Sequence, residues 1–487
     1  VYKRQKQALA ATGARITAVG DTHNILSLAD KNTEIIDLQG RTLLPGFIDP
    51  HSHFLRAGLY DAFVVNLSSP PVGKILCMDE LIDTLKIVSE KTAENEWVMG
   101  YAYDDTLLAE KQHPLAKDLD KASRHHPVFI RHVSGHLAVL NTKALAMLGI
   151  DKDSTCSLGG TICKDGAGHP TGLLQGEPAM QFAEEKMPKW TSRHWLQAAQ
   201  NASDMYAAKG VTTAQEGDAY PGDYELYLRA NDQDLLKPRI QIYPSWRFPD
   251  ELKKYPCPTS GTALTDDLML SLGAVKLYQD GSIQGYSGYL SQAYHHYLPG
   301  VEKGSLGMAR NSPEQLNTAI ARAHENGWQI AVHANGDQAI EEVITAFELA
   351  QNNFPRTDCR HIIIHCQTVR EDQMDRMQKL GIIPSFFAAH IYFWGDRHWN
   401  IFLGPERARR INPCKSAVDR QMAFTCHNDT YITPMDPLLS VWAAVNRLSY
   451  GGRCLGEEFR VSVPEAIRSV TSYAAFQFGE ELSLIHI

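Results

Sequence analysis

Two histidines one residue apart are well suited to bind a metal ion. His51 and His53 follow the short apolar run 46–48, which has the character of a buried strand. Side chains at positions i and i+2 of a strand point to the same face, so both imidazoles can reach one point. Neutral imidazole nitrogens bind divalent ions such as zinc at about 2.0–2.1 Å. The pair therefore indicates a metal site, although two polar residues at a strand end are also commonly just solvated.

Four further polar residues lie in or at the ends of short strand-like runs: Lys276 in 274–278, His333 in 329–333, His365 in 361–365 and Asp429 in 424–429. Apolar runs of this length between helical stretches are typical of buried parallel strands. In a barrel of alternating strands and helices, functional side chains lie at the carboxyl ends of the strands. Each residue alone would also fit a hydrogen-bonded core histidine or half of an ion pair. Together they predict one site.

The order His-x-His, Lys, His, His, Asp resembles the amidohydrolase superfamily of metal-dependent hydrolases, in particular its amidohydrolase-3 type branch, which includes N-substituted formamide deformylases. The matching stretches are residues 44–53, 210–213, 275–282, 332–337 and 427–430, and the resemblance extends from about residue 13 to 481. It implies a mononuclear or binuclear site with the ligands His51, His53, Lys276, His333, His365 and Asp429. In such sites the lysine is often carboxylated and bridges two metals, and the aspartate binds metal and shuttles a proton.

The spacing of the strand-like runs predicts an α/β fold, a (β/α)8 TIM barrel. Eight runs qualify: residues 46–51, 210–214, 238–243, 273–278, 329–333, 361–365, 381–388 and 423–428. Helical periodicity occupies most of the gaps, for example residues 313–326 and 337–351. The first of these helices has Ser312 as its expected N-cap and Gly327 just beyond its end. Strands that alternate with helices favour a parallel sheet.

One segment between two predicted strands is too long for this alternation of strands and helices. Residues 52–209 separate the first two strands, where one crossover needs roughly 30 residues. The gap contains its own strand at 127–133, a turn-rich stretch at 157–171 and a helical stretch at 180–189. We interpret residues 56–205 as a subdomain inserted over the mouth of the barrel, with a displaced barrel strand as the alternative. Arg131, His132 and His136 are then candidates on the substrate side.

The ends of the chain predict a small β-domain that is incomplete. Residues 6–44 supply its N-terminal part, with strands expected within 8–20 and 32–44, and the barrel covers residues 45–450. Residues 451–481 are expected to form a C-terminal helix and part of a return to the β-domain. Residues 1–5 and 482–487 have the character of cloning or sequencing scars and are left out of the fold prediction.

The composition narrows the class of protein. A chain of 487 residues exceeds the usual size of a single core, so a barrel with additions is expected. The formal net charge of -9, with both signs well mixed, argues against nucleic acid or an anionic membrane as partner. No apolar run reaches the roughly 18 residues of a transmembrane helix. We expect a small-molecule substrate and, by default, a cytoplasmic location, and leave homo-oligomer formation open.

The cysteines suggest neither a disulfide framework nor a zinc knuckle. All nine are scattered through the chain without a Cys-x-x-Cys pair. Cys366 and Cys426 lie near the proposed ligands in the sequence. Free buried cysteines commonly act as small hydrophobic residues, so we expect neither to bind the metal.

The ligand set also indicates a mechanism. A metal held by His51, His53 and Asp429 would lower the pKa of bound water from about 15.7 to about 7, giving hydroxide at neutral pH. Asp429 can then accept the water proton and pass it to the leaving nitrogen. We expect His390, after the seventh strand, to contact the oxyanion, and His427 to face away from the site. Four residues are predicted to bind substrate: His136, Asp280, Tyr392 and Trp394. Asp280 could instead orient a ligand, and the aromatic residues could belong to the core.

The predicted function is hydrolysis of a non-peptide carbon–nitrogen bond in an amide, formamide or carbamate, with one or two zinc-like ions as cofactor. A deaminase or a cyclic-imide hydrolase would use the same ligands, so both stay open as alternatives. A non-catalytic regulator on a hydrolase scaffold is a third interpretation. Loss of a metal ligand would favour it, and every expected ligand type is present in the sequence.

Overall fold

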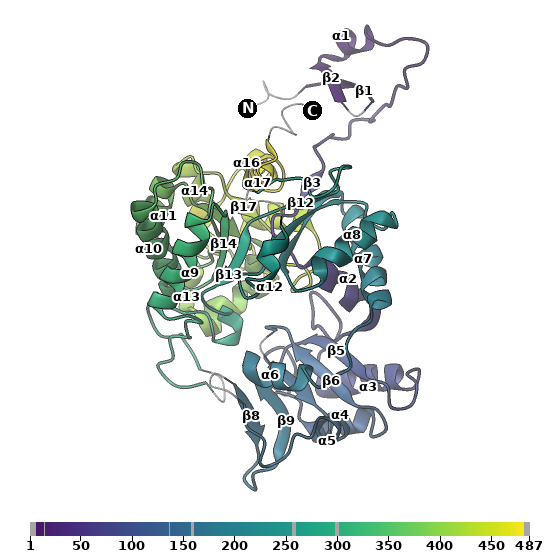
Figure 1. The fold of residues 1–487 in the computed structure, drawn as a ribbon, viewed down its shortest axis with the longest axis vertical. Coiled ribbons are helices and arrows are strands. Elements are labelled where there is room, and N and C mark those ends of the chain that lie inside the picture. Colours follow the sequence, from purple (N-terminus) through teal and green to yellow (C-terminus); the bar gives the residue numbers. More distant parts are fainter. Residues whose placement is uncertain are drawn as a thin grey trace.

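The computed structural model describes residues 6–13, 15–135, 137–156, 160–255, 260–297 and 301–481. It confirms the α/β class: parallel strands form the centre of the larger lobe, and helices cover them on the outside (Figure 1). The predicted substrate residue His136 and the two predicted terminal scars lie outside the described residues. No helix in the described part of the chain is long and apolar enough to cross a lipid bilayer.

The central strands pair in parallel in two sheets, with the orders β12-β11-β10-β3 and β13-β14-β15-β16-β17. Their bounds are β3 Phe47–Ile48, β10 Val211–Ala219, β11 Arg239–Pro244, β12 Leu270–Leu272, β13 Val275–Tyr278, β14 Ile330–Ala334, β15 Ile362–His365, β16 Ile383–Phe386 and β17 Thr425–Cys426. Each of the eight predicted runs overlaps one of these strands, and β12 is an additional strand that directly precedes the fourth run.

Short contacts join the edges of the two sheets. Ser245, just after β11, forms a parallel bridge with Lys276 of β13. At the opposite edges, the amide of Asp429 after β17 donates to the carbonyl of His51 after β3 at 3.2 Å. The last central strand therefore lies next to the first, and the residues that follow both strands meet.

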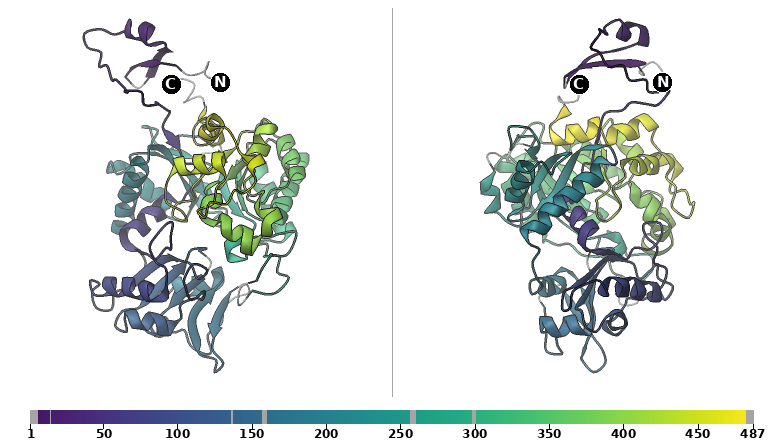
Figure 2. Two further views of the ribbon diagram at one scale, coloured as in Figure 1. Left: turned by 180° about the vertical axis from the view of Figure 1, so that it is seen from behind. Right: turned by 90° about the vertical axis from the view of Figure 1, so that its right-hand side faces the viewer.

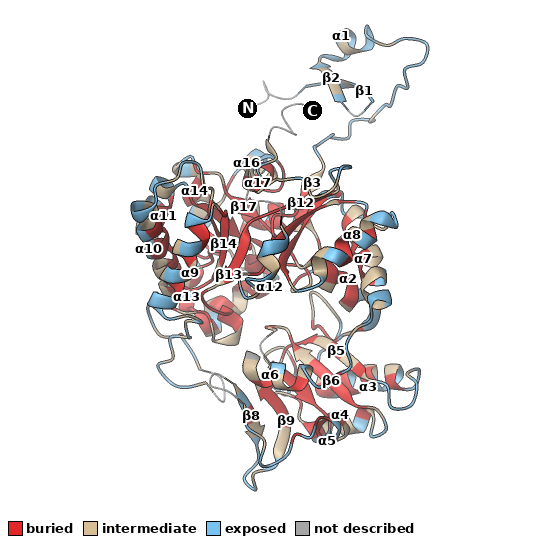
Figure 3. Ribbon diagram, in the orientation of Figure 1, coloured by how far each residue is buried: buried red, intermediate tan, exposed pale blue. Residues whose placement is uncertain are grey.

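Amphipathic helices between the strands cover their outer face: α2 Phe54–Phe63, α7 Ser192–Ala207, α8 Asp223–Asp232, α9 Pro313–Glu325, α10 Asp337–Asn353, α11 Glu371–Leu380, α14 Cys414–Asp419 and α15 Pro437–Asn446. Two further helices, α12 Ala389–Arg397 and α13 Gly404–Ala408, pack instead in a separate buried cluster with Ile283. The start of α9 is as predicted, because Ser312 Oγ accepts from the amide of Gln315 at 3.2 Å. Apolar side chains of the strands, such as Val332 and Ile363, form a buried core with Ile340 of α10 (Figure 3).

A separate six-stranded sheet, between β3 and β10 in the sequence, forms the lower lobe of Figure 1. Its order is β4-β5-β6-β7-β9-β8, and its elements are β4 Val65–Asn66, α3 Met78–Ser89, β5 Val98–Tyr103, α4 Ala116–Ala122, β6 Val128–His132, β7 Leu137–Leu140, α5 Thr142–Leu148, β8 Thr161–Lys164, β9 Pro170–Gln175 and α6 Glu177–Glu184. The strand predicted at 127–133 is β6 of this sheet.

This lobe contains fewer residues than the predicted insertion 56–205, because helices α2 and α7 pack on the central strands and not on the six-stranded sheet. Phe54 of α2 and Tyr206 of α7 share a buried core with Val211 of β10. The lobe therefore begins after α2 and ends before α7, and these two helices connect it to the central strands (Figure 2).

The N-terminal segment forms an antiparallel pair, β1 Ala8–Thr12 and β2 Arg15–Gly20, followed by α1 Thr22–Leu26. The strands predicted within 32–44 are wrong, since these residues form none. A strand needs a neighbour that accepts its hydrogen bonds and covers its apolar side chains. Here Ile35 and Ile36 are 65% and 72% exposed. The C-terminal segment contributes α16 Val463–Ser469 and α17 Ser472–Phe478, which lie beside the start of β3 (Figure 2).

Candidate metal centre

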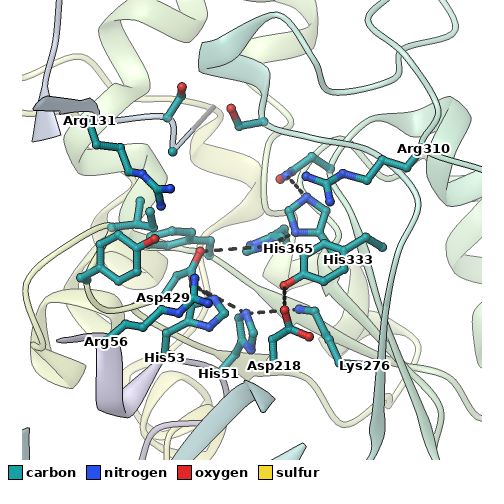
Figure 4. A pocket seen from close by; sticks show the side chains of 18 of the residues that line it. His51, His53, Arg56, Arg131, Asp218, Lys276, Arg310, His333, His365 and Asp429 are labelled. Atoms are coloured by element: carbon teal, nitrogen blue, oxygen red, sulfur yellow. Dashed lines mark hydrogen bonds and ion pairs between the residues drawn. The ribbon is translucent and has the colours of Figure 1, made fainter. Parts of the chain in front are cut away.

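A cavity of about 540 Å³ lies between the ends of the central strands and the six-stranded lobe (Figure 4). All six predicted metal ligands line it: His51, His53, Lys276, His333, His365 and Asp429. The parallel register brings neighbouring strands to a common level there, since Tyr278 pairs with His333 and Ala334 pairs with His365. The lower lobe contributes Arg131 and Glu184 to the opposite wall.

The most compact group of ligands is formed by His51, His53 and Asp429, whose ligand atoms all lie within 4.8 Å of one another. Asp429 Oδ1 is 3.6 Å from His51 Nε2 and 3.4 Å from His53 Nε2. This oxygen is buried and has no hydrogen-bond partner among the described residues. A buried carboxylate oxygen without a donor is costly unless a cation neutralises it. The donor set of two imidazoles and a carboxylate therefore fits a zinc-like ion.

Gln215 in the middle of β10 fixes the ring of His51. The Gln215 side-chain nitrogen donates to the carbonyl of Pro50 at 2.7 Å, so its oxygen accepts from His51 Nδ1, also at 2.7 Å. With the proton on Nδ1, His51 presents an unprotonated Nε2 to Asp429 and Lys276. Gly217 leaves room for this ring, because a Cβ there would lie 2.5 Å from His51 Cε1.

His333 and His365 form a second group next to the first. His365 Nε2 lies 3.1 Å from His333 Nδ1 and 4.0 Å from Asp429 Oδ2. His427 supports this group from behind, with its Nε2 3.1 Å from His365 Nδ1. The prediction that His427 faces away was wrong. It assumed that the irregular end of the strand turns His427 away; β17 does end at Cys426, but the ring of His427 still points to His365.

Lys276 lies between the two groups, with its Nζ 3.5 Å from His51 Nε2. Its side chain is buried, and this burial lowers the pKa of the Lys276 amine to about 8. The carboxylates that act on it are Asp218 and Asp429. A lysine with such a pKa is partly uncharged near neutral pH, and only the uncharged amine can react with carbon dioxide.

Asp280 is placed behind His333 and does not line the cavity. Its buried carboxylate accepts from the amides of Tyr289, Asn335 and Gly336 at 2.8–2.9 Å. Its Oδ1 is also 3.6 Å from His333 Nε2. Burial raises the pKa of Asp280 to about 7. These contacts fix the loop that follows His333, and the alternative role of Asp280, orienting a ligand, stays a prediction.

Asp429 and His365 have left-handed backbone conformations, with φ of 49° and 71°. Such conformations cost roughly 1–3 kcal/mol for a residue other than glycine and cluster at functional sites.

Burial raises the pKa of Asp429 to about 7. A carboxyl group with a pKa near the working pH can both accept and release a proton.

The predicted residues after β16 are only partly brought to the cavity. His390 lines it, but from the first turn of α12 rather than from a strand end, and its ring stacks on Phe387 at 3.9 Å. Trp394 is buried against His390, and Tyr392 packs against Trp442, so neither lines the cavity. Because this stretch is a helix, Tyr392 turns away from the site, while Trp394, one turn after His390, packs against its ring. The cysteines Cys366 and Cys426 are buried, free and outside the cavity lining.

The sequence analysis missed several residues of the cavity: Arg56, Asp218, Tyr220, Arg247, Arg310 and Tyr431. Asp218 lies on β10, which continues past the predicted end at 214 to Ala219. Polar residues at 215, 216 and 218, at the end of a predicted strand, were the available indication. Arg247 forms an ion pair with Asp218 and donates to the Tyr220 hydroxyl at 2.7 Å.

Comparison with known proteins agrees with this geometry. A sequence model described as "Amidohydrolase family" matches residues 34–486. The putative amidohydrolase YtcJ of Bacillus subtilis is 26% identical over 464 residues, covering 91% of this chain and 81% of that protein. The N-substituted formamide deformylase of Arthrobacter pascens is 25% identical over 485 residues, covering 97% of this chain and 86% of that protein.

A solved structure shares the fold. It is an uncharacterized metal-dependent hydrolase from Pyrococcus furiosus, with a TM-score of 0.73 and 24% sequence identity. The likeness covers 97% of this chain and 91% of that chain, so it includes both lobes.

Proposed function

Because this chain belongs to the amidohydrolase family and is a hydrolase of non-peptide carbon–nitrogen bonds, we propose that it cleaves a small amide, formamide or carbamate. The observation that supports this most is the buried Oδ1 of Asp429, which has no hydrogen-bond partner among the described residues and lies near the Nε2 atoms of His51 and His53. This group combines a metal-binding position with a carboxylate that can move a proton. Amide hydrolysis needs both.

We also infer that the two central sheets close into one (β/α)8 barrel, with residues 65–184 inserted over its mouth. The bridge between Ser245 and Lys276 and the hydrogen bond between Asp429 and His51 support closure. The position of the cavity supports the second part, because residues of the inserted lobe line it opposite the strand ends.

His51, His53 and Asp429 would hold one divalent ion, zinc or a similar metal. Lys276, His333 and His365 would complete a second position if the lysine is carboxylated, because carboxylation replaces a cation with an anionic oxygen donor. When bound, such an ion supplies Lewis acidity, which polarises the scissile carbonyl and acidifies water.

Residues of the chain carry out the proton transfers and bind the oxyanion. Asp429 accepts the proton of the attacking water on a carboxylate oxygen and then donates it to the leaving nitrogen. Burial lowers the pKa of His390 well below its usual value, so this imidazole is neutral. A neutral imidazole still carries one N–H, which can donate to the developing oxyanion.

A substrate panel tests this proposal. Metal-loaded protein is assayed with N-formyl and N-acyl amines, with amino-substituted heterocycles and with cyclic imides, following amine release, ammonia release and ring opening. We expect amine release from the first class, and none from the Asp429→Asn variant. Ammonia release alone, or ring opening alone, would instead support the deaminase or cyclic-imide alternative. Full metal content without turnover of any class would favour a regulatory protein.

A further inference from the structure

We propose that the substrate carries a carboxylate, which Arg56 binds together with Arg131 on the wall of the cavity next to His53. This inference deepens the proposed function, on which it rests, by naming a feature of the substrate. It limits the substrates to amides with an anionic group, such as N-acylated or N-formylated amino acids.

The first argument is the charge of the cavity wall. Four arginines line it: Arg56, Arg131, Arg247 and Arg310. Outside the predicted metal ligands, the carboxylates that line it among the described residues are Asp218 and Glu184. The described residues of the wall therefore carry more positive than negative charge, which concentrates an anionic ligand in a cavity with low-dielectric walls.

The second argument is that, in the described part of the chain, Arg56 and Arg131 have fewer acidic or hydrogen-bonding partners than Arg247 has. Arg247 is held by Asp218. Arg131 forms an ion pair with Glu184, but its buried Nε has no hydrogen-bond partner among the described residues. Arg56 lies with its guanidinium carbon 4.5 Å from the ring centroid of Tyr220, and among the described residues no carboxylate oxygen lies within 4.0 Å of it. A ligand carboxylate would supply the missing acceptors, and guanidinium groups bind carboxylates in a bidentate manner.

The third argument is position. Arg56 lies in the first turn of α2, directly after the ligand His53. In Figure 4 it lies beside His53 and Asp429, while Arg131 approaches the same side from β6 of the inserted lobe. Arg131 Nη1 donates to the hydroxyl of Tyr60 at 3.4 Å, and the Tyr60 ring packs on Tyr431 at 4.4 Å. These rings orient the guanidinium groups, so an anion bound there would place the rest of the substrate toward the metal ligands.

Matched substrates test the inference. N-formyl amino acids are compared with the N-formyl amines that lack only the carboxylate, on metal-loaded wild-type protein and on Arg56→Gln and Arg56→Lys variants. We expect wild type to prefer the acid in kcat/KM by roughly a hundredfold, the loss typical of removing one partner of a buried charge pair. The preference should nearly vanish in Arg56→Gln and return in part in Arg56→Lys. Arg229→Gln, at an exposed arginine on α8, serves as the control and should behave as wild type.

A binding measurement separates this inference from the proposed function. Calorimetry compares 4-phenylbutanoate with the uncharged 4-phenylbutanol on metal-loaded wild-type and Arg56→Gln protein. Preference for the acid that is lost in Arg56→Gln supports the anion site, even if no amide is turned over and the proposed function fails. Equal affinity of both proteins for the acid, or no preference for it in wild type, overturns the inference, even if amides are hydrolysed.

Discussion

Asp429→Asn is expected to lower kcat for an amide substrate by roughly a hundredfold or more, the usual contribution of general acid–base catalysis. Asparagine keeps the size of the side chain and an oxygen that can still coordinate weakly. It cannot accept a proton at neutral pH, so the step that activates water and protonates the leaving nitrogen is lost. KM should change much less, because Asp429 acts on the reacting atoms rather than on the rest of the substrate. Steady-state kinetics of the metal-loaded proteins give both values.

His390→Asn is the matched comparison. It lines the same cavity, and its loss should cost less than that of Asp429, since a bound ion can carry much of the oxyanion charge. If Asp429→Asn keeps most of its kcat, the assignment of the base is wrong. The proton acceptor would then have to be sought at His390 or His136.

Lys276 is expected to carry a carboxyl group in the metal-loaded protein. An ammonium beside two metal ions would be repelled, whereas a carboxylated lysine offers them two oxygen ligands. Supplying ¹³C-labelled bicarbonate should therefore give a carbamate signal in the NMR spectrum of wild type. Lys276→Ala should lack that signal and lose activity by roughly 10–100-fold or more. Mutation of a residue that only hydrogen-bonds to a metal ligand already costs about that much, and Lys276 is proposed to be a ligand itself.

Lys379→Ala, at an exposed lysine of α11, is the control and should retain both signal and activity. The alternative is an unmodified lysine next to a single ion. Electron density with a bare amine at Lys276 and one metal ion would establish that alternative and refute the bridging role.

The metal ligands could be predicted because they sit in or just after short apolar strands. The apolar runs before His333 and His365 are local features, and parallel pairing then brings their ends to one edge. Side-chain directions could not be predicted where the backbone is irregular. We expected the irregular strand end to turn His427 away, but beyond the end of β17 its ring points to His365.

The arginines of the cavity depend on tertiary structure that no local pattern encodes. Arg56 belongs to the first turn of a helix and Arg131 to a strand of a separate sheet, far apart in the sequence. Nothing in either segment alone shows that both face one cavity. Tertiary structure also decides the fate of Tyr392 and Trp394, which were predicted to bind substrate. The helical backbone of α12 turns Tyr392 toward Trp442, and Trp394 is buried against His390.

The central claim is that His51 and His53 hold a catalytic metal ion, and elemental analysis of purified protein tests it most directly. The comparison is between wild type, His51→Ala/His53→Ala and a control, His295→Ala/His296→Ala, whose two adjacent histidines are exposed and outside the cavity lining. Circular dichroism verifies that all three proteins are folded. We predict one or two divalent ions per chain in wild type and in the control, and a clear loss in His51→Ala/His53→Ala. Equal metal content in all three folded proteins would contradict this account.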